Sequence, residues 1–255
     1  DWPARLYQND RAGFDAIDVD LRGLLARARL RLSISDAMSQ AFEARYGVPF
    51  VAFANGIDPA LWVQPRVHQP GPVLLRYAGG LAPDMNARAV QTAARAVQTL
   101  AEQGHDIRFE INTQSWWLDP AKRLFQGLKS VSITAEKRDF AGYRDWLCGA
   151  DILLIATNFD AASTTYVRYS MANKMPEVLA SGAAVLVHGP RSIATVDVLA
   201  DSISDDGEEF FALLSDPRFA NGGEGTARRP TVGDTGGAII TIGDTPPRER
   251  GRIQF

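Results

Sequence analysis

The sequence has few of the residues that build disulfides or metal sites. Cys148 is its one cysteine, and three histidines are scattered along 255 residues. Because a single cysteine cannot close an intrachain disulfide, we expect a reducing, cytoplasmic compartment. Isolated histidines and one thiol do not supply the ligand set of a zinc site. We therefore expect no metal.

Long apolar runs and a charge of one dominant sign are also missing. The aliphatic run Ile152–Ala156 falls far short of the ~20 residues that a membrane helix needs. With 27 basic and 30 acidic side chains, the formal charge of −3 does not favour nucleic acid as a partner, and an anionic ligand must be met by a local group of cations. The chain starts at Asp1 with no signal peptide or methionine, so we expect a fragment or a processed product.

Residues 1–63 predict the end of one domain. Leucines at helical spacing indicate a helix within 10–31, and RLRLSIS (29–35) alternates as a half-buried strand does. Ser35 and Gly47 can start and stop a second helix, ahead of a strand in PFVAFANGID (49–58). The following stretch, QPRVHQPGP (64–72), has three prolines and a glycine and predicts a linker.

From residue 73 to residue 214, strands and helices alternate. This alternation predicts an α/β domain whose parallel sheet is doubly wound and Rossmann-like, with ligands bound beyond the carboxyl ends of the strands. Residues 215–255 are rich in glycine, proline, threonine and arginine and predict an irregular tail. The expected strands are 73–80, 107–112, 129–133, 151–156 and 183–189, and the expected helices begin at Asn86 or span 119–128 and 139–148.

Two short patterns each allow a functional and a structural interpretation. Gly79 and Gly80 end a strand and precede a helix, which suits a close approach of the backbone to a diphosphate or sugar. An ordinary tight turn explains them equally well, and no third glycine completes a dinucleotide fingerprint. Asp18 and Asp20 form a D-x-D, but residues two apart do not share a helix face. We therefore interpret this pair as solvated helix residues.

A polar stretch, 157–177, predicts a long loop between a buried strand and a helix. Loops of this length in compact domains are often functional. Its cations, Arg168 and Lys174, stand near a helix N-terminus and could cradle a diphosphate. Glu177, one turn later, could then accept hydrogen bonds from the vicinal hydroxyls of a ribose. The alternative is that Glu177 only complements the helix dipole.

Several of these segments resemble one group of enzymes. NKMPEVLASGAAVLVHGP (173–190) is similar to the segment around the second glutamate of GT-B-fold glycosyltransferases, especially the retaining family 4 group. The segments YAGGL (77–81), ADILLIATNFD (150–160) and ISDAMSQAFEARYGVPFVAFANGID (34–58) resemble other parts of the same group in the same order.

The resemblance implies the C-terminal, sugar-nucleotide-binding domain of a GT-B fold, with part of the N-terminal, acceptor-binding domain before it. It implies transfer of a sugar from a nucleotide diphosphate to a carbohydrate or lipid-linked acceptor in polysaccharide or glycoconjugate biosynthesis, with retention and without a cofactor. Peripheral membrane association of the full-length protein fits such acceptors. The residues implied as catalytic are Ser170, Lys174 and Glu177, and those implied in nucleotide-sugar binding are Gly79, Gly80, Thr113, Arg168, Ser170, Asn173, Lys174 and Glu177.

The sequence also departs from this group. Ser170 is taken to stand where the first of two glutamates separated by seven residues is usual, and Gly80 and Met85 replace a basic pair. We expect Arg168 and Lys174 to supply the missing charge, and the isolated chain to be inactive. Two alternatives stay open: a non-catalytic module that binds sugar nucleotides, and a nicotinamide-dinucleotide domain, against which the incomplete glycine fingerprint argues.

Overall fold

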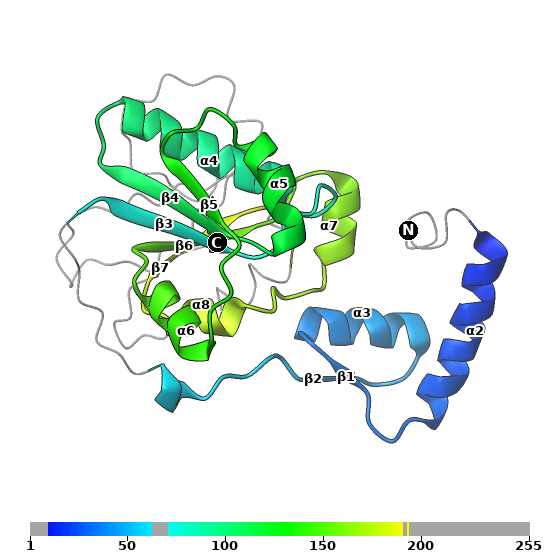
Figure 1. Ribbon diagram of the computed structural model, residues 1–255. Helices are drawn as coiled ribbons and strands as arrows, with labels where there is room; N and C mark the ends of the chain where they lie inside the picture. The colour runs from blue at the N-terminus through cyan, green and yellow to red at the C-terminus, as the bar shows by residue number, and fades with distance from the viewer. Residues whose placement is uncertain (1–9, 63–70, 191–192, 194–255) are drawn as a thin grey trace, which may run out of the picture.

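The computed structural model describes residues 10–62, 71–190 and 193. Its centre is a five-stranded parallel sheet in the order β5-β4-β3-β6-β7 (Figure 1). Chain order reverses between β3 and β6, which makes their carboxyl ends the switch point where ligands bind in such sheets. The strands are β3 (Val73–Ala78), β4 (Ile107–Asn112), β5 (Val131–Thr134), β6 (Ile152–Ala156) and β7 (Ala184–His188).

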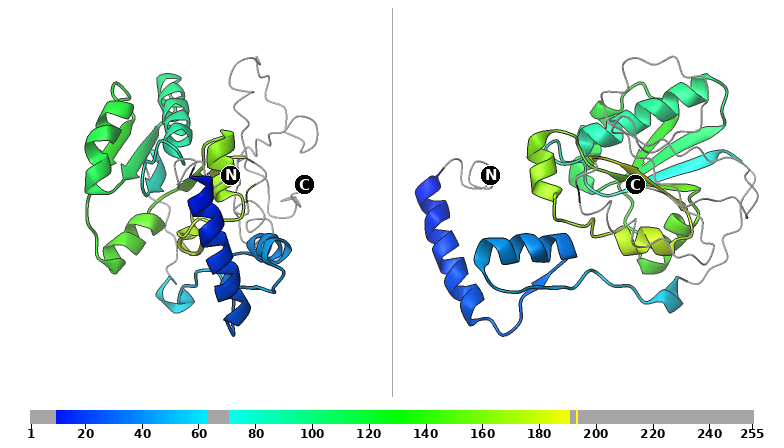
Figure 2. Two further views of the ribbon diagram at one scale, coloured as in Figure 1. Left: turned by 90° about the vertical axis from the view of Figure 1, so that its right-hand side faces the viewer. Right: turned by 180° about the vertical axis from the view of Figure 1, so that it is seen from behind.

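Helices cover both faces of this sheet (Figures 1 and 2). On one face, α4 (Ala87–Glu102) and α5 (Ser115–Leu124) pack on side chains such as Phe109. On the other, α6 (Phe140–Cys148) and α8 (Met175–Ala180) pack on Leu153 and its neighbours. Burial on both faces explains why β6 is apolar throughout, whereas β4 and β5 alternate in burial. The predicted doubly wound, Rossmann-like fold is confirmed.

Residues 10–62 form a smaller unit beside the sheet. It contains α2 (Arg11–Arg27), β1 (Leu32–Ser33), α3 (Asp36–Tyr46), β2 (Val51–Ala52) and the short helix η1 (Pro59–Leu61), and β1 pairs with β2 in parallel. The predicted caps of α3 are confirmed, since Ser35 Oγ accepts from the Met38 N–H and Gly47 has φ 70°. Asp18 forms ion pairs with Arg22 and Arg45 on this unit, and no group of three metal-ligating side chains occurs within the described residues.

Three predicted elements were wrong in position or type. The helix predicted over 119–128 starts at Ser115, because Pro120 lies inside the helix instead of opening it. The strand predicted over 129–133 is shifted to Val131–Thr134. The predicted long loop contains a helix, α7 (Ala161–Val167), whose first turn is capped by the Asp160 carboxylate accepting from the Ser163 N–H.

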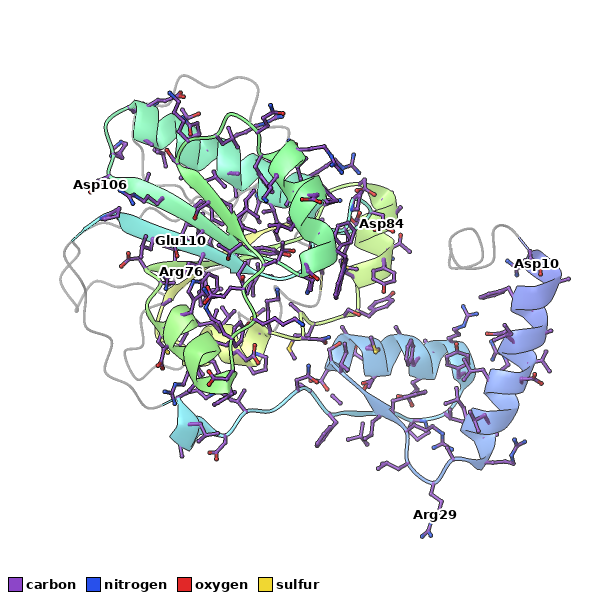
Figure 3. All side chains as sticks on the ribbon, viewed as in Figure 1. Asp10, Arg29, Arg76, Asp84, Asp106 and Glu110 are labelled. Carbon is purple, nitrogen blue, oxygen red and sulfur yellow. The ribbon has the colours of Figure 1, made fainter. Side chains whose placement is uncertain are left out.

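The amino and carboxyl ends of the strands lie at opposite ends of the sheet. Figure 3 labels Asp106, next to the amino end of β4, and Asp84, beyond the carboxyl end of β3, on opposite sides of the sheet. The predicted linker at 64–72 and tail at 215–255 fall wholly or largely outside the described residues, and the domain boundaries remain predictions. In the part of the chain that is described, no helix is both long and apolar enough to cross a membrane.

Candidate functional site

The Lys174 side chain reaches the carboxyl end of β3. Residue 174 is the N-cap of α8, and its Nζ lies 4.8 Å from the centroid of the Tyr77 ring. A Cβ built on Gly79 would overlap this ammonium, and Gly79 has φ 150°, a conformation that other residues rarely adopt. Gly79 therefore makes room for the lysine, a reason for the glycine that sequence analysis missed.

The Lys174 ammonium is removed from water while keeping an acidic neighbour. The residue as a whole is half-buried, with its charged end turned inward over Tyr77. Burial lowers the pKa of Lys174 to about 8, and the Glu177 carboxylate partly opposes this by raising it. A buried cation of this kind gains stability when an anion arrives. Because α8 has only six residues, attraction of an anion at this point rests on the lysine more than on the helix dipole.

Glu177 points to a different place from Lys174. It lines a cavity of about 400 Å³ together with Asn55, Gly56, Asn173 and Pro176, among other residues. One carboxylate oxygen accepts a hydrogen bond of 3.3 Å from the Tyr143 hydroxyl, and burial together with this carboxylate raises the pKa of Tyr143. The other carboxylate oxygen makes no hydrogen bond within the described residues, and the division of roles between Lys174 and Glu177 stays a prediction.

The small N-terminal unit forms part of this cavity. The Asn55 amide donates to the Asn173 carbonyl at 3.3 Å and to its side-chain oxygen at 3.4 Å. The Ser35 hydroxyl donates to the Tyr169 carbonyl at 2.8 Å. These bonds hold the segment before α8 against residues 53–57, so the expected site residue Asn173 lies at the junction of the two units.

Two further expected residues, Arg168 and Ser170, lie at the end of α7 and just after it. Arg168 ends α7 and is exposed, and it makes no hydrogen bond or ion pair within residues 10–62, 71–190 and 193. Ser170 follows α7, and its N–H donates to the Val167 carbonyl. When seven residues, 170–176, stand between the two glutamate positions, the first position is Tyr169. Placing Ser170 at that position was therefore wrong by one residue.

Asn158 fixes the shape of the turn that follows Gly79. This buried side chain accepts from the Ala89 N–H at 3.1 Å and donates to the Pro83 carbonyl at 2.9 Å. Its own N–H donates to the Met85 carbonyl at 2.7 Å. Asn86 was expected to cap α4, but its side chain makes no capping hydrogen bond. Asn158, in the loop after β6, satisfies the helix N-terminus instead. Sequence analysis missed this role because the partner lies 69 residues away.

Thr113, expected in nucleotide-sugar binding, follows β4 next to the glycine pair. It is 6% exposed, and its Oγ1 has no hydrogen-bond partner in the described structure. The side-chain oxygens of its neighbours Gln114 and Asn86 are also buried without a partner. Gln114 belongs to the loop 113–117, which was expected to contact the nucleotide, whereas Asn86 was expected only at the start of a helix.

Comparison with solved structures identifies the fold. The chain is similar to a point mutant of S. aureus TarM in complex with fondaparinux, α-GlcNAc-glycerol and UDP, with a TM-score of 0.53 and 10% identity over 76% of this chain and 36% of that one. It is similar to trehalose 6-phosphate synthase from Burkholderia multivorans, with a TM-score of 0.52 and 12% identity over 70% of this chain and 48% of that one. It is also similar to a glycosyltransferase from Rickettsia africae, with a TM-score of 0.51 and 13% identity over 72% of this chain and 49% of that one.

These matched structures share the GT-B fold, and the resemblance to it is confirmed at the level of fold. This chain spans about half the length of the first solved structures it matches, 47% and 48%. No protein-family model matches the sequence, and comparison with curated proteins gives no match.

Proposed function

We propose that this chain is the sugar-nucleotide-binding half of a GT-B glycosyltransferase. The complete enzyme transfers a sugar from a nucleotide diphosphate to a carbohydrate or lipid-linked acceptor, with retention and without a metal. We place it in polysaccharide or glycoconjugate synthesis at the cytoplasmic side of a membrane. The observation that carries this proposal is the Lys174 ammonium seated on Gly79 at the switch point of the sheet.

In this proposal Lys174 binds the diphosphate. When the bond between sugar and diphosphate breaks, negative charge grows on the leaving phosphate, and a fixed cation in a water-poor site stabilises it strongly. Lys174 meets that description because Tyr77 and Gly79 enclose its Nζ. Arg168, exposed at the end of α7, adds a second positive charge on the solvent side.

Glu177 binds the ribose through its carboxylate. The Tyr143 hydroxyl orients one oxygen, and the cavity beside the 53–57 segment provides room for a sugar ring. Asn173 completes the wall on the side of the N-terminal unit, and Ser170 precedes that wall in the chain. The TarM structure that resembles this chain contains UDP, which supports a nucleoside diphosphate as the ligand.

Calorimetric titration with nucleosides, nucleoside diphosphates and nucleotide sugars tests these roles. Lys174→Ala should weaken diphosphate binding while leaving nucleoside affinity unchanged. Glu177→Gln should weaken both by about tenfold, since a charge-assisted hydrogen bond contributes ~1.5–3 kcal/mol. Tyr143→Phe is the matched control for Glu177→Gln, because it removes the 3.3 Å bond to the carboxylate but keeps the charge. Diphosphate affinity that is the same in Lys174→Ala and the original protein would refute the proposal.

A further inference from the structure

A group of unpaired polar atoms lies beside the glycine pair. Four buried side-chain atoms in the described residues have no hydrogen-bond partner, and three of them, Asn86 Oδ1, Thr113 Oγ1 and Gln114 Oε1, come from the starts of α4 and α5. Buried polar groups are nearly always paired. Three unpaired oxygens at the ligand-binding edge of a parallel sheet therefore point to a ligand that supplies hydrogen bonds.

The direction of the Asn86 amide follows from Tyr77. The Tyr77 hydroxyl donates its single proton to the Gly80 carbonyl at 2.7 Å, so its oxygen can only accept from Asn86, 2.9 Å away. The Asn86 NH₂ group must face Tyr77, and Oδ1 is left as an acceptor. Burial raises the pKa of Tyr77, so the hydroxyl keeps this proton at neutral pH.

Gly80 leaves a small space that an acceptor and a donor both border. The position of a Cβ on Gly80 would lie 3.3 Å from Trp117 Nε1 and 3.4 Å from Gln114 Oε1. A side chain at residue 80 would crowd both atoms. The Trp117 indole N–H is a donor only, so the group around Gly80 combines acceptor oxygens with one donor.

We propose that Asn86, Thr113, Gln114 and Trp117 form the subsite for the hydroxyl groups of the transferred sugar. A sugar hydroxyl donates to one group and accepts from another, which matches amide oxygens beside an indole N–H. Phosphate offers acceptor atoms only and would be repelled by the amide oxygens. This inference rests on the proposed function, and it extends that function from the diphosphate to the sugar.

The position of the group agrees with the covalent structure of a nucleotide sugar. Its sugar is bonded directly to the terminal phosphate, so the sugar subsite must adjoin the phosphate subsite. Lys174 lies against the Cβ position of Gly79, and Gln114 Oε1 lies beside that of the next residue, Gly80, whose Cα stands about 3.8 Å further along the chain. A nucleobase is separated from the sugar by the ribose and both phosphates, so it does not fit the same place.

Two conservative variants test the subsite. Thr113→Val and Gln114→Met keep the volume of the side chain and remove its hydrogen-bonding atoms. Their matched controls are Thr99→Val and Gln103→Met, at the far end of α4, where both residues are exposed. Asn86 is left intact because its amide also holds Tyr77. The calorimetric probes are four pairs: UDP and UDP-glucose, GDP and GDP-mannose, ADP and ADP-glucose, and dTDP and dTDP-glucose.

In the pair that binds, each test variant should lose about five- to tenfold in affinity for the nucleotide sugar, the worth of one hydrogen bond. Affinity for the nucleoside diphosphate should stay within about twofold, as in a change that spares the phosphate contacts. The melting temperature of Thr113→Val should not fall, because the variant removes an unpaired buried hydroxyl. The control variants should change neither affinity.

The other outcomes overturn the inference in distinguishable ways. Equal losses for diphosphate and sugar nucleotide would assign the atoms to phosphate or base. Unchanged affinities with normal diphosphate binding would mean that these oxygens are hydrated structural groups, and only the subsite would fail. If none of the eight compounds binds the unmodified chain, the proposed function fails together with the subsite.

Discussion

The charged end of Lys174 is buried, and we therefore expect the free energy of unfolding to depend on pH in a specific way. Its pKa is about 8 in the folded state against an ordinary value of 10.5, so the unfolded chain binds an extra proton between these values. The contribution of Lys174 to the free energy of unfolding should therefore rise from pH 8 to pH 9.5 by about 1.5 kcal/mol. Urea unfolding across this range should show the rise, and Lys174→Met should lack it.

The same residue links pH to ligand affinity. If the charged ammonium holds the diphosphate, affinity for UDP or its equivalent should fall by about tenfold per pH unit above the free pKa. Lys174→Met should bind weakly at every pH. A wild-type affinity that does not change between pH 7 and pH 9.5 would show that the Lys174 amine does not bind the phosphate.

The contact between β3 and α8 can be tested through two glycines. Gly79→Ala should push the Lys174 ammonium toward water, because the new Cβ would occupy its place. The lysine pKa should then return toward 10.5, and the stability gain above pH 8 should shrink. Gly182→Ala is the control, since Gly182 also has a positive φ of 73° but open space around it. It should cost stability and keep the pH dependence.

Asn158 joins β6 to the turn before α4 and to the start of that helix. Asn158→Ala should lower the free energy of unfolding by roughly 2–4 kcal/mol, because it leaves the buried Ala89 N–H without a partner and removes the bond to the Pro83 carbonyl. Thermal or urea unfolding measures the change. Asn173→Ala, an exposed asparagine, should stay within about 0.5 kcal/mol. Equal effects in the two variants would show that Asn158 does not organise the turn.

Across the whole molecule, the two units differ in how much of their apolar surface is buried by neighbouring elements. The β1–β2 pair is two residues long on each strand, and Leu32, Val51 and Phe53 are 49%, 56% and 69% exposed. Two-stranded sheets are marginal by themselves, whereas β3, β4 and β6 are buried between helices. We expect amide hydrogen exchange to be far faster in residues 32–53 than in the five-stranded sheet. Similar protection in both units would contradict this expectation.

The sequence by itself determined most of the elements, because their signals are local. The alternating strand at Ile107–Asn112 was predicted with the bounds that the structure shows. The caps of α3 and the Asp139 cap of α6 lie within a few residues of the groups they satisfy. Local signals failed in two places: the helix predicted over 119–128 begins at Ser115, and the polar stretch predicted as a loop contains α7. Glu177 and Lys174 could be singled out because a charged residue near a predicted helix start can be recognised from the sequence alone.

Only the tertiary structure decided what these residues touch. Lys174 lies 95 residues after Gly79 in the chain, yet its ammonium takes the place where a Gly79 side chain would stand. The pairing exists because parallel strands β3 and β6 end at the same edge of the sheet. Thr113, Gln114 and Asn86 carry no local sign that their oxygens lack partners. Hydrogen-bond satisfaction depends on all neighbours in space, so it becomes visible when the helices are packed on the sheet.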